Sequence, residues 1–178
     1  MPLVVLLALV LAQITRGGTS RPTSSASAAA TASVSATAPP NDPSTVEPCA
    51  QVLDALPVQL DGQNPRKVFV AQTVAWGQPP VILTCGVARP AGLVAGSTAP
   101  VLNVSGVEWF VEDQQSVVLY TVVDRSVYIQ VSYHGNLPQP PLATISTAVL
   151  KALPTPVCYV DTPIAAAPNL PLCTRRPQ

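Results

Sequence analysis

The chain has 178 residues and no net formal charge, and only 10% of its side chains are charged. A protein that binds nucleic acid needs a basic surface, and the few cations of this sequence form no basic cluster, so nucleic acid is excluded as a partner. The length suits one domain. The 21 prolines favour loops, turns and linkers over long helices.

An unbroken apolar run, PLVVLLALVLA, occupies residues 2–12. Its length is typical of the apolar region of a signal peptide and is short for a membrane span, which needs about 20 residues. Its end at Ala12 fits a cleavage site of the A-x-A type. No Lys or Arg precedes the run, so it could instead end a longer anchor that starts upstream of Met1. We assign residues 1–18 to a signal peptide or N-terminal membrane anchor and expect an extracytoplasmic protein, secreted or membrane-anchored.

Residues 19–46 are rich in Ser, Thr, Ala and Pro and contain almost no large apolar side chain. Such a segment cannot bury enough surface to offset the entropy of ordering, so we predict a disordered tether. A tether of this kind can hold a domain away from a membrane or pass through a wall layer. A plain spacer is the alternative.

The patterns of one α+β domain occupy residues 47–157. The domain is predicted to open with a helix over residues 46–56. Ser44 and Glu47 have the spacing of a capping box, and the apolar side chains that follow share one helical face. Pro57 ends this helix.

The middle of the domain predicts strands, because apolar residues either alternate or form short runs there. Polar and glycine-containing turns separate these strands. We expect a long loop over residues 86–100 and tight turns at 113–116 and 124–125. The five predicted strands are residues 68–76, 81–85, 107–111, 117–123 and 126–133.

Apolar residues recur at helical spacing over residues 140–153, and Pro154 stops this second helix. The predicted fold is α+β, with an antiparallel sheet of about five strands and two helices packed on one face. Residues 158–178 form a Pro-rich C-terminal tail.

The sequence contains four cysteines, and export makes disulfides the expected state of an even number. Three pairings are possible, and we favour Cys49–Cys85 with Cys158–Cys173. The first would join the opening helix to a core strand, and the second would close the C-terminal tail. No C-x-x-C motif occurs and His134 is the single histidine, so we expect neither a metal site nor a cofactor.

Four residues are weak candidates for binding a ligand on the predicted sheet. Glu108 and Glu112 lie four apart on one strand face, about 13 Å from each other by the strand rise. Carboxyl pairs that hydrolyse sugars are closer, at about 5 to 9.5 Å, so a solvated face is the better interpretation. Trp76 and Trp109 could stack on a sugar, although such residues more often fill a core.

His134 is the fifth weak candidate, after the last predicted strand. A hydrolase would need a nucleophile and an orienting acid beside it, and no G-x-S-x-G signature occurs. A surface histidine is the better interpretation. We therefore assign no catalytic residue.

Several motifs occur in a fixed order along the domain. They are CA at 49–50, LP at 56–57, AWGQPP at 75–80, LTCGVARP at 83–90, VSGVEWF at 104–110 and TVVDRSVY at 121–128. Together they resemble an actinobacterial exported-protein family of uncharacterised function (domain of unknown function 3515), over about residues 48–153. The resemblance implies export, supports the Cys49–Cys85 pairing and implies no activity.

These observations predict an exported cell-envelope protein, a non-catalytic binding or structural module. Its partner would be an envelope protein or a cell-wall component, bound through the sheet face or the 86–100 loop. An N-terminal segment that is not cleaved would also contact the membrane. The alternative is an enzyme that acts on cell-wall material through Glu108, Glu112 or His134.

Overall fold

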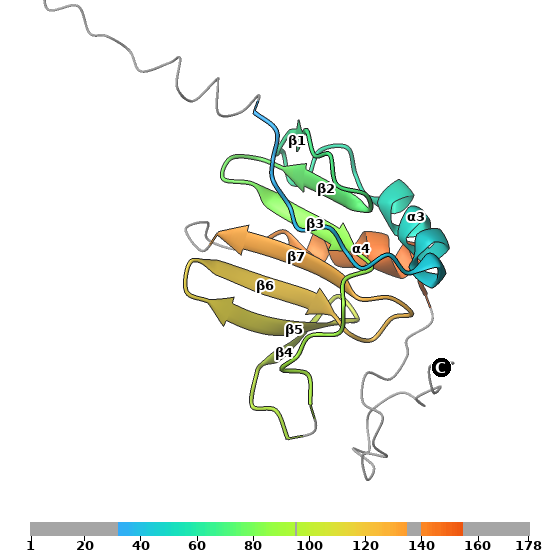
Figure 1. Ribbon diagram of the computed structural model, residues 1–178, viewed down its shortest axis with the longest axis vertical. Coiled ribbons are helices and arrows are strands. Elements are labelled where there is room, and N and C mark those ends of the chain that lie inside the picture. Colours follow the sequence, from blue (N-terminus) through green and yellow to red (C-terminus); the bar gives the residue numbers. More distant parts are fainter. Residues whose placement is uncertain (1–31, 95, 135–139, 155–178) are drawn as a thin grey trace, which may run out of the picture.

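The computed structural model describes residues 32–94, 96–134 and 140–154. Within these residues the strands form one antiparallel sheet of seven strands, in the order β1-β2-β3-β7-β6-β5-β4. Two helices, α3 and α4, pack on the same side of it (Figure 1). The predicted α+β class and helix placement are confirmed. The predicted number of strands is wrong, because β1 and β4 at the two edges were not expected.

Helix α3 spans Val46–Ala55 and ends where Leu56 becomes extended, one residue before Pro57. The predicted capping box is absent from this helix: its N-cap residue, Thr45, makes no capping bond through its side chain. A short 3-10 turn, η1 (Pro43–Thr45), precedes α3 instead. Its cap is Asp42, whose carboxylate accepts a 2.9 Å hydrogen bond from the Ser44 amide.

Strands β1 (Pro65–Arg66), β2 (Thr73–Trp76) and β3 (Val81–Cys85) form one side of the sheet. The strand predicted over residues 68–76 therefore begins only at Thr73. Residue Gln72 has a positive φ of 55°, which interrupts an extended strand at that point.

Strands β4 (Val101–Val104), β5 (Val107–Gln114), β6 (Val117–Val122) and β7 (Ile129–His134) form the other side. The turn predicted at 113–116 is shorter than expected, because residues 113 and 114 still belong to β5. The chain reverses at Gln115, where φ is 60°.

The main core lies between the sheet and the helices. Helix α4 spans Leu142–Ala152 and places Ile145 and Val149 fully in this core. No helix among the described residues is long and apolar enough to cross a membrane. The sheet residues that face the helices alternate along each strand, and they include Leu83, Cys85, Val107, Trp109, Val122, Ile129 and Val131.

Residues 32–45, which the sequence assigns to the tether, make defined contacts with the domain. The Val34 amide donates to the Lys67 carbonyl at 2.8 Å, and the Arg66 guanidinium donates to the Ala32 carbonyl at 2.8 Å. From the bridge between Val34 and Val68, the segment runs across the sheet to the start of α3 (Figure 1). The contacts of the domain thus begin well before residue 47.

Candidate functional site

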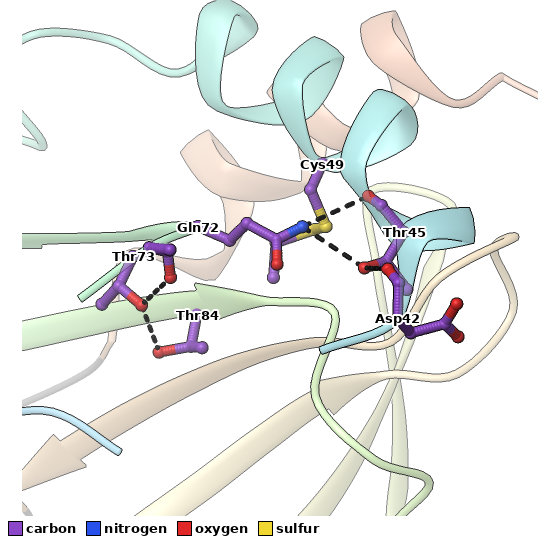
Figure 2. Close-up of a disulfide and its surroundings, with 8 residues drawn as sticks. Asp42, Thr45, Cys49, Gln72, Thr73 and Thr84 are labelled. Atoms are coloured by element: carbon purple, nitrogen blue, oxygen red, sulfur yellow. Dashed lines mark hydrogen bonds between the residues drawn. A yellow bond between two sulfur atoms is a disulfide. The ribbon is translucent and has the colours of Figure 1, made fainter. Parts of the chain in front are cut away.

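The disulfide between Cys49 and Cys85 joins helix α3 to the end of strand β3 (Figure 2). Both residues are fully buried, and their Cα atoms lie 5.6 Å apart. The predicted pairing is confirmed. The second predicted pair, Cys158 and Cys173, lies outside the described residues.

Polar side chains lie around the disulfide, and those of Thr45, Gln72, Thr73 and Thr84 are neutral, whereas Asp42 is acidic (Figure 2). The Gln72 amide donates to the hydroxyl and the carbonyl of Thr45, at 3.3 and 3.4 Å. The Thr73 and Thr84 hydroxyls lie 3.3 Å apart on neighbouring strands. The bonds from Gln72 join the residue before β2 to the residue before α3, so they act beside the disulfide to hold the helix against the sheet.

Both tryptophans lie in the core, and neither presents a ring face to solvent. Trp109 is fully buried, and its indole N–H donates to the Ser146 hydroxyl of α4 at 3.0 Å. Trp76 is 3% exposed, and its indole N–H donates to the Val58 carbonyl at 3.1 Å. The structure therefore uses both rings to anchor the layers.

Glu108 and Glu112 point from β5 to the sheet face away from the helices, since the intervening Trp109 faces the helices. Both are half-buried. A carboxylate oxygen of Glu108 accepts a 2.6 Å hydrogen bond from the Asn103 amide on β4. Strand geometry separates the two Cα atoms by about 13 Å, so the two carboxylates do not form a pair.

His134 is exposed at the end of β7, on the same sheet face as the two glutamates. The register places Glu112 in line with Leu119 of β6 and Ser132 of β7, and His134 lies two residues further along β7 than Ser132. Two strand spacings and two residues separate the Cα atoms of Glu112 and His134 by about 12 Å. The three candidates share a face but are dispersed over it. Within the described ranges, no group of three or more potential metal ligands occurs.

A buried ion pair, Asp124 with Arg125, lies in the connection from β6 to β7. Arg125 is 1% exposed and Asp124 is 7% exposed. The guanidinium contacts the Asp124 carboxylate at 2.5 Å and donates to the carbonyls of Asp124 and Gly106, at 2.9 and 2.8 Å. One side chain thus fastens the β6–β7 connection to the β4–β5 turn.

Burial raises the pKa of the Asp124 carboxyl above its ordinary value of 3.8, although the charge of Arg125 opposes this shift. One of its oxygens, Oδ1, is buried and accepts no hydrogen bond from the described residues. The sequence indicated only a tight turn here. The signal that could have revealed the pair is the TVVDRSVY motif itself, since it places two charges directly between apolar strands.

A protein-family model described as "Protein of unknown function (DUF3515)" matches residues 1–157. The chain belongs to this family. No curated protein and no solved structure matches the chain. The DUF3515 match includes the N-terminal apolar run, the Cys49–Cys85 disulfide and the Asp124–Arg125 pair, so all three features lie within the family region.

Proposed function

We propose that this DUF3515 protein is an exported cell-envelope protein whose domain is a non-catalytic binding or structural module. The Cys49–Cys85 disulfide carries the proposal. Disulfides form and persist outside the reducing cytosol, and this one is fully buried between the two layers of the fold. The apolar run at residues 2–12 supports the same location, since it has the length of a signal-peptide core.

The placement of the ionisable side chains supports a non-catalytic role. General acid–base chemistry needs groups within hydrogen-bond reach of one reacting atom. Glu108 bonds to Asn103, and Glu112 and His134 lie about 12 Å apart by the sheet geometry. The buried pair Asp124–Arg125 holds two turns together.

The sheet face away from the helices is the proposed contact surface for an envelope protein or a wall component. Ser132 and Gln130 of β7 and Glu112 of β5 are half-buried there, and His134 is exposed at its end. Hydroxyl, amide and carboxylate groups of this kind form hydrogen bonds with a polar partner. The 86–100 loop covers part of this face, since Leu93 packs with Phe110 of β5 in a second buried cluster. The half-buried polar groups beside that cluster can bind a partner without a deep pocket.

Co-sedimentation of the full-chain protein with isolated cell envelopes tests this surface. We expect Ser132→Arg, which adds a large charged side chain in the middle of the face, to weaken retention about tenfold, equivalent to ~1.4 kcal/mol. The matched control is Thr147→Arg on the exposed side of α4, which should leave retention unchanged. Equal retention of both variants, or no retention of the unaltered protein, would remove the binding proposal.

Export is tested separately with alkaline phosphatase fused to the C-terminus, because this reporter is active only where its own disulfides form. We expect activity from the full-chain fusion and none from a fusion that lacks residues 1–18. An inactive full-chain fusion would contradict export.

A further inference from the structure

We propose that two copies of this chain pair through their β4 edges, forming a two-fold symmetric dimer in which the two sheets become continuous. The starting observation is that the two edges of the sheet differ. An unprotected edge strand presents unpaired backbone groups to other chains, and proteins usually protect such edges with proline, charge or a covering segment.

The β1 edge has all three kinds of protection. It starts with Pro65, which has no backbone N–H, and it carries the cation Arg66, with Lys67 directly after the strand. Residues 32–34 lie along it, with the Val34 amide bonded to the Lys67 carbonyl at 2.8 Å. This edge is therefore closed to another strand.

The β4 edge lacks these protections. Its sequence, VLNV, contains neither a charged residue nor a proline, and the strand lies at the end of the sheet formed by the described residues. Val101 is 37% exposed and Leu102 is 42% exposed. An exposed apolar edge of this kind is the surface to which a further strand adds most readily.

Two hydrogen bonds define which backbone groups of β4 point outward. The Val111 amide donates to the Pro100 carbonyl at 3.0 Å, and the Val123 amide donates to the Glu108 carbonyl at 3.0 Å. The first bond makes Pro100 and Val111 a bonded pair, and because bonded and non-bonded pairs alternate in an antiparallel ladder, Leu102 and Trp109 form the next bonded pair. The second bond shows that Glu108, opposite Asn103, bonds on the β6 side and not to β4. The N–H and C=O groups of Val101 and Asn103 therefore face away from the sheet.

This arrangement is self-complementary, which is why we assign a second copy as the occupant. In an antiparallel pairing centred on Leu102, Val101 of each copy lies opposite Asn103 of the other. Each of these two pairs is joined by two backbone hydrogen bonds. The two Leu102 side chains become direct cross-strand neighbours, about 5 Å apart at Cβ, and bury apolar surface against each other. Like charges do not meet, because β4 is uncharged.

An edge of four residues buries little area, so the dimer belongs to the weak class of interfaces. Sedimentation velocity of the full-chain protein in detergent, at concentrations up to about 1 mM, measures it. That limit corresponds to a binding free energy of about −4 kcal/mol. We expect a reversible monomer–dimer equilibrium within this range. A protein that stays monomeric throughout would overturn the proposal.

A charge-swap experiment tests the register. Leu102→Lys and Leu102→Glu each place like charges opposite each other and should raise the Kd at least about tenfold. An equimolar mixture of the two variants should dimerise again, since the opposite charges then meet. The matched control is Val58→Lys, at another exposed apolar residue, which should keep the wild-type Kd.

The remaining outcomes each contradict the proposal. Unchanged dimerisation of Leu102→Lys would mean association through another part of the chain. A mixture that stays monomeric would exclude the pairing centred on Leu102. Loss of the dimer in Val58→Lys would show that the edge is not the determinant. Circular dichroism of each variant confirms that it is folded, and Leu102→Glu replaces Leu102→Lys if the latter is not.

Discussion

Arg125 connects two turns that are distant in the sequence, and it does so from a fully buried position. Its guanidinium bonds to the carboxylate and carbonyl of Asp124 and to the carbonyl of Gly106. A buried ion pair is worth little compared with an apolar replacement of both residues, but removing one partner leaves an uncompensated charge. The pair therefore matters most when it is broken on one side.

Arg125→Ala should lower the free energy of unfolding by about 3–5 kcal/mol, because Asp124 then stays buried without its counterion. Urea denaturation measures the change. Lys151→Ala, at an exposed position of α4, is the control and should stay within about 0.5 kcal/mol of the unaltered protein. A loss no larger than that of the control would show that the pair contributes nothing.

Asp124 also predicts a pH dependence. Because burial raises its pKa in the folded protein above 3.8, the folded state favours the protonated carboxyl. The stability that Asp124 contributes is then fully present at pH values below its ordinary pKa of 3.8, and it is lost as the pH rises through the folded-state pKa. Compared with Asp124→Asn, the unaltered protein should become less stable as the pH rises from 3 toward 7. Urea midpoints of both proteins at several pH values measure this. If the unaltered protein instead gains stability over Asp124→Asn as the pH rises, the prediction is contradicted.

At the scale of elements, the β4–β5 hairpin determines where the exposed edge lies. Its two-residue turn has positive φ at both positions, 51° at Ser105 and 81° at Gly106. Such a turn matches the twist of the adjoining strands and needs residues that tolerate the left-handed region. The Gly106 carbonyl also accepts from Arg125, so the turn and the ion pair stabilise each other.

Gly106→Val should destabilise the protein by about 1–3 kcal/mol through backbone strain, since a β-branched residue rarely adopts this φ. Crowding is not the cause, because a Cβ at this position meets no atom within 4 Å. Gly106→Asn is the matched variant and should lose less, since Asn tolerates the left-handed region. Thermal unfolding compares the two, and equal losses would exclude strain as the reason.

The sequence predicted the elements that alternate or form apolar runs, namely α3, α4, β3, β5, β6 and β7. It missed β1 and β4 because edge strands need no buried face and so leave no clear pattern: β4 is exposed at three of its four residues. It extended β2 too far because the apolar residues near Val68 pair with the segment at Val34 instead of the sheet. A contact between segments that are distant in the sequence leaves no pattern in the residues around either one, so the sequence could not predict it.

At the scale of the whole molecule, the disulfide joins the helical layer to the sheet across a sequence separation of 36 residues. The sequence left three pairings open and favoured this one, because Cys49 falls on the opening helix and Cys85 on a core strand and because the family resemblance supports the pair. The Asp124–Arg125 pair was not predictable in the same way, since its burial depends on the β4–β5 turn folding over it.

Replacing both Cys49 and Cys85 with Ala should lower the free energy of unfolding by about 4 kcal/mol, on the chain-entropy account of a loop of this length. The direct measurement is a urea transition of the double variant beside that of the oxidised protein. Chemical reduction of the unaltered protein should produce at least this loss, because it would also break the predicted Cys158–Cys173 bond. A double variant as stable as the oxidised protein would mean that packing alone holds α3 on the sheet.

The central claim, an exported domain with an oxidised core disulfide, is tested most directly in cells. Free thiols are alkylated before lysis, and disulfides are then reduced and alkylated with a second, heavier reagent. Mass spectrometry of the peptides that contain Cys49 and Cys85 reads the state of each. Both should carry the heavier label, in protein recovered from the culture fluid or the membrane fraction. Both cysteines carrying the first label, in protein found with the cytosol, would contradict the account.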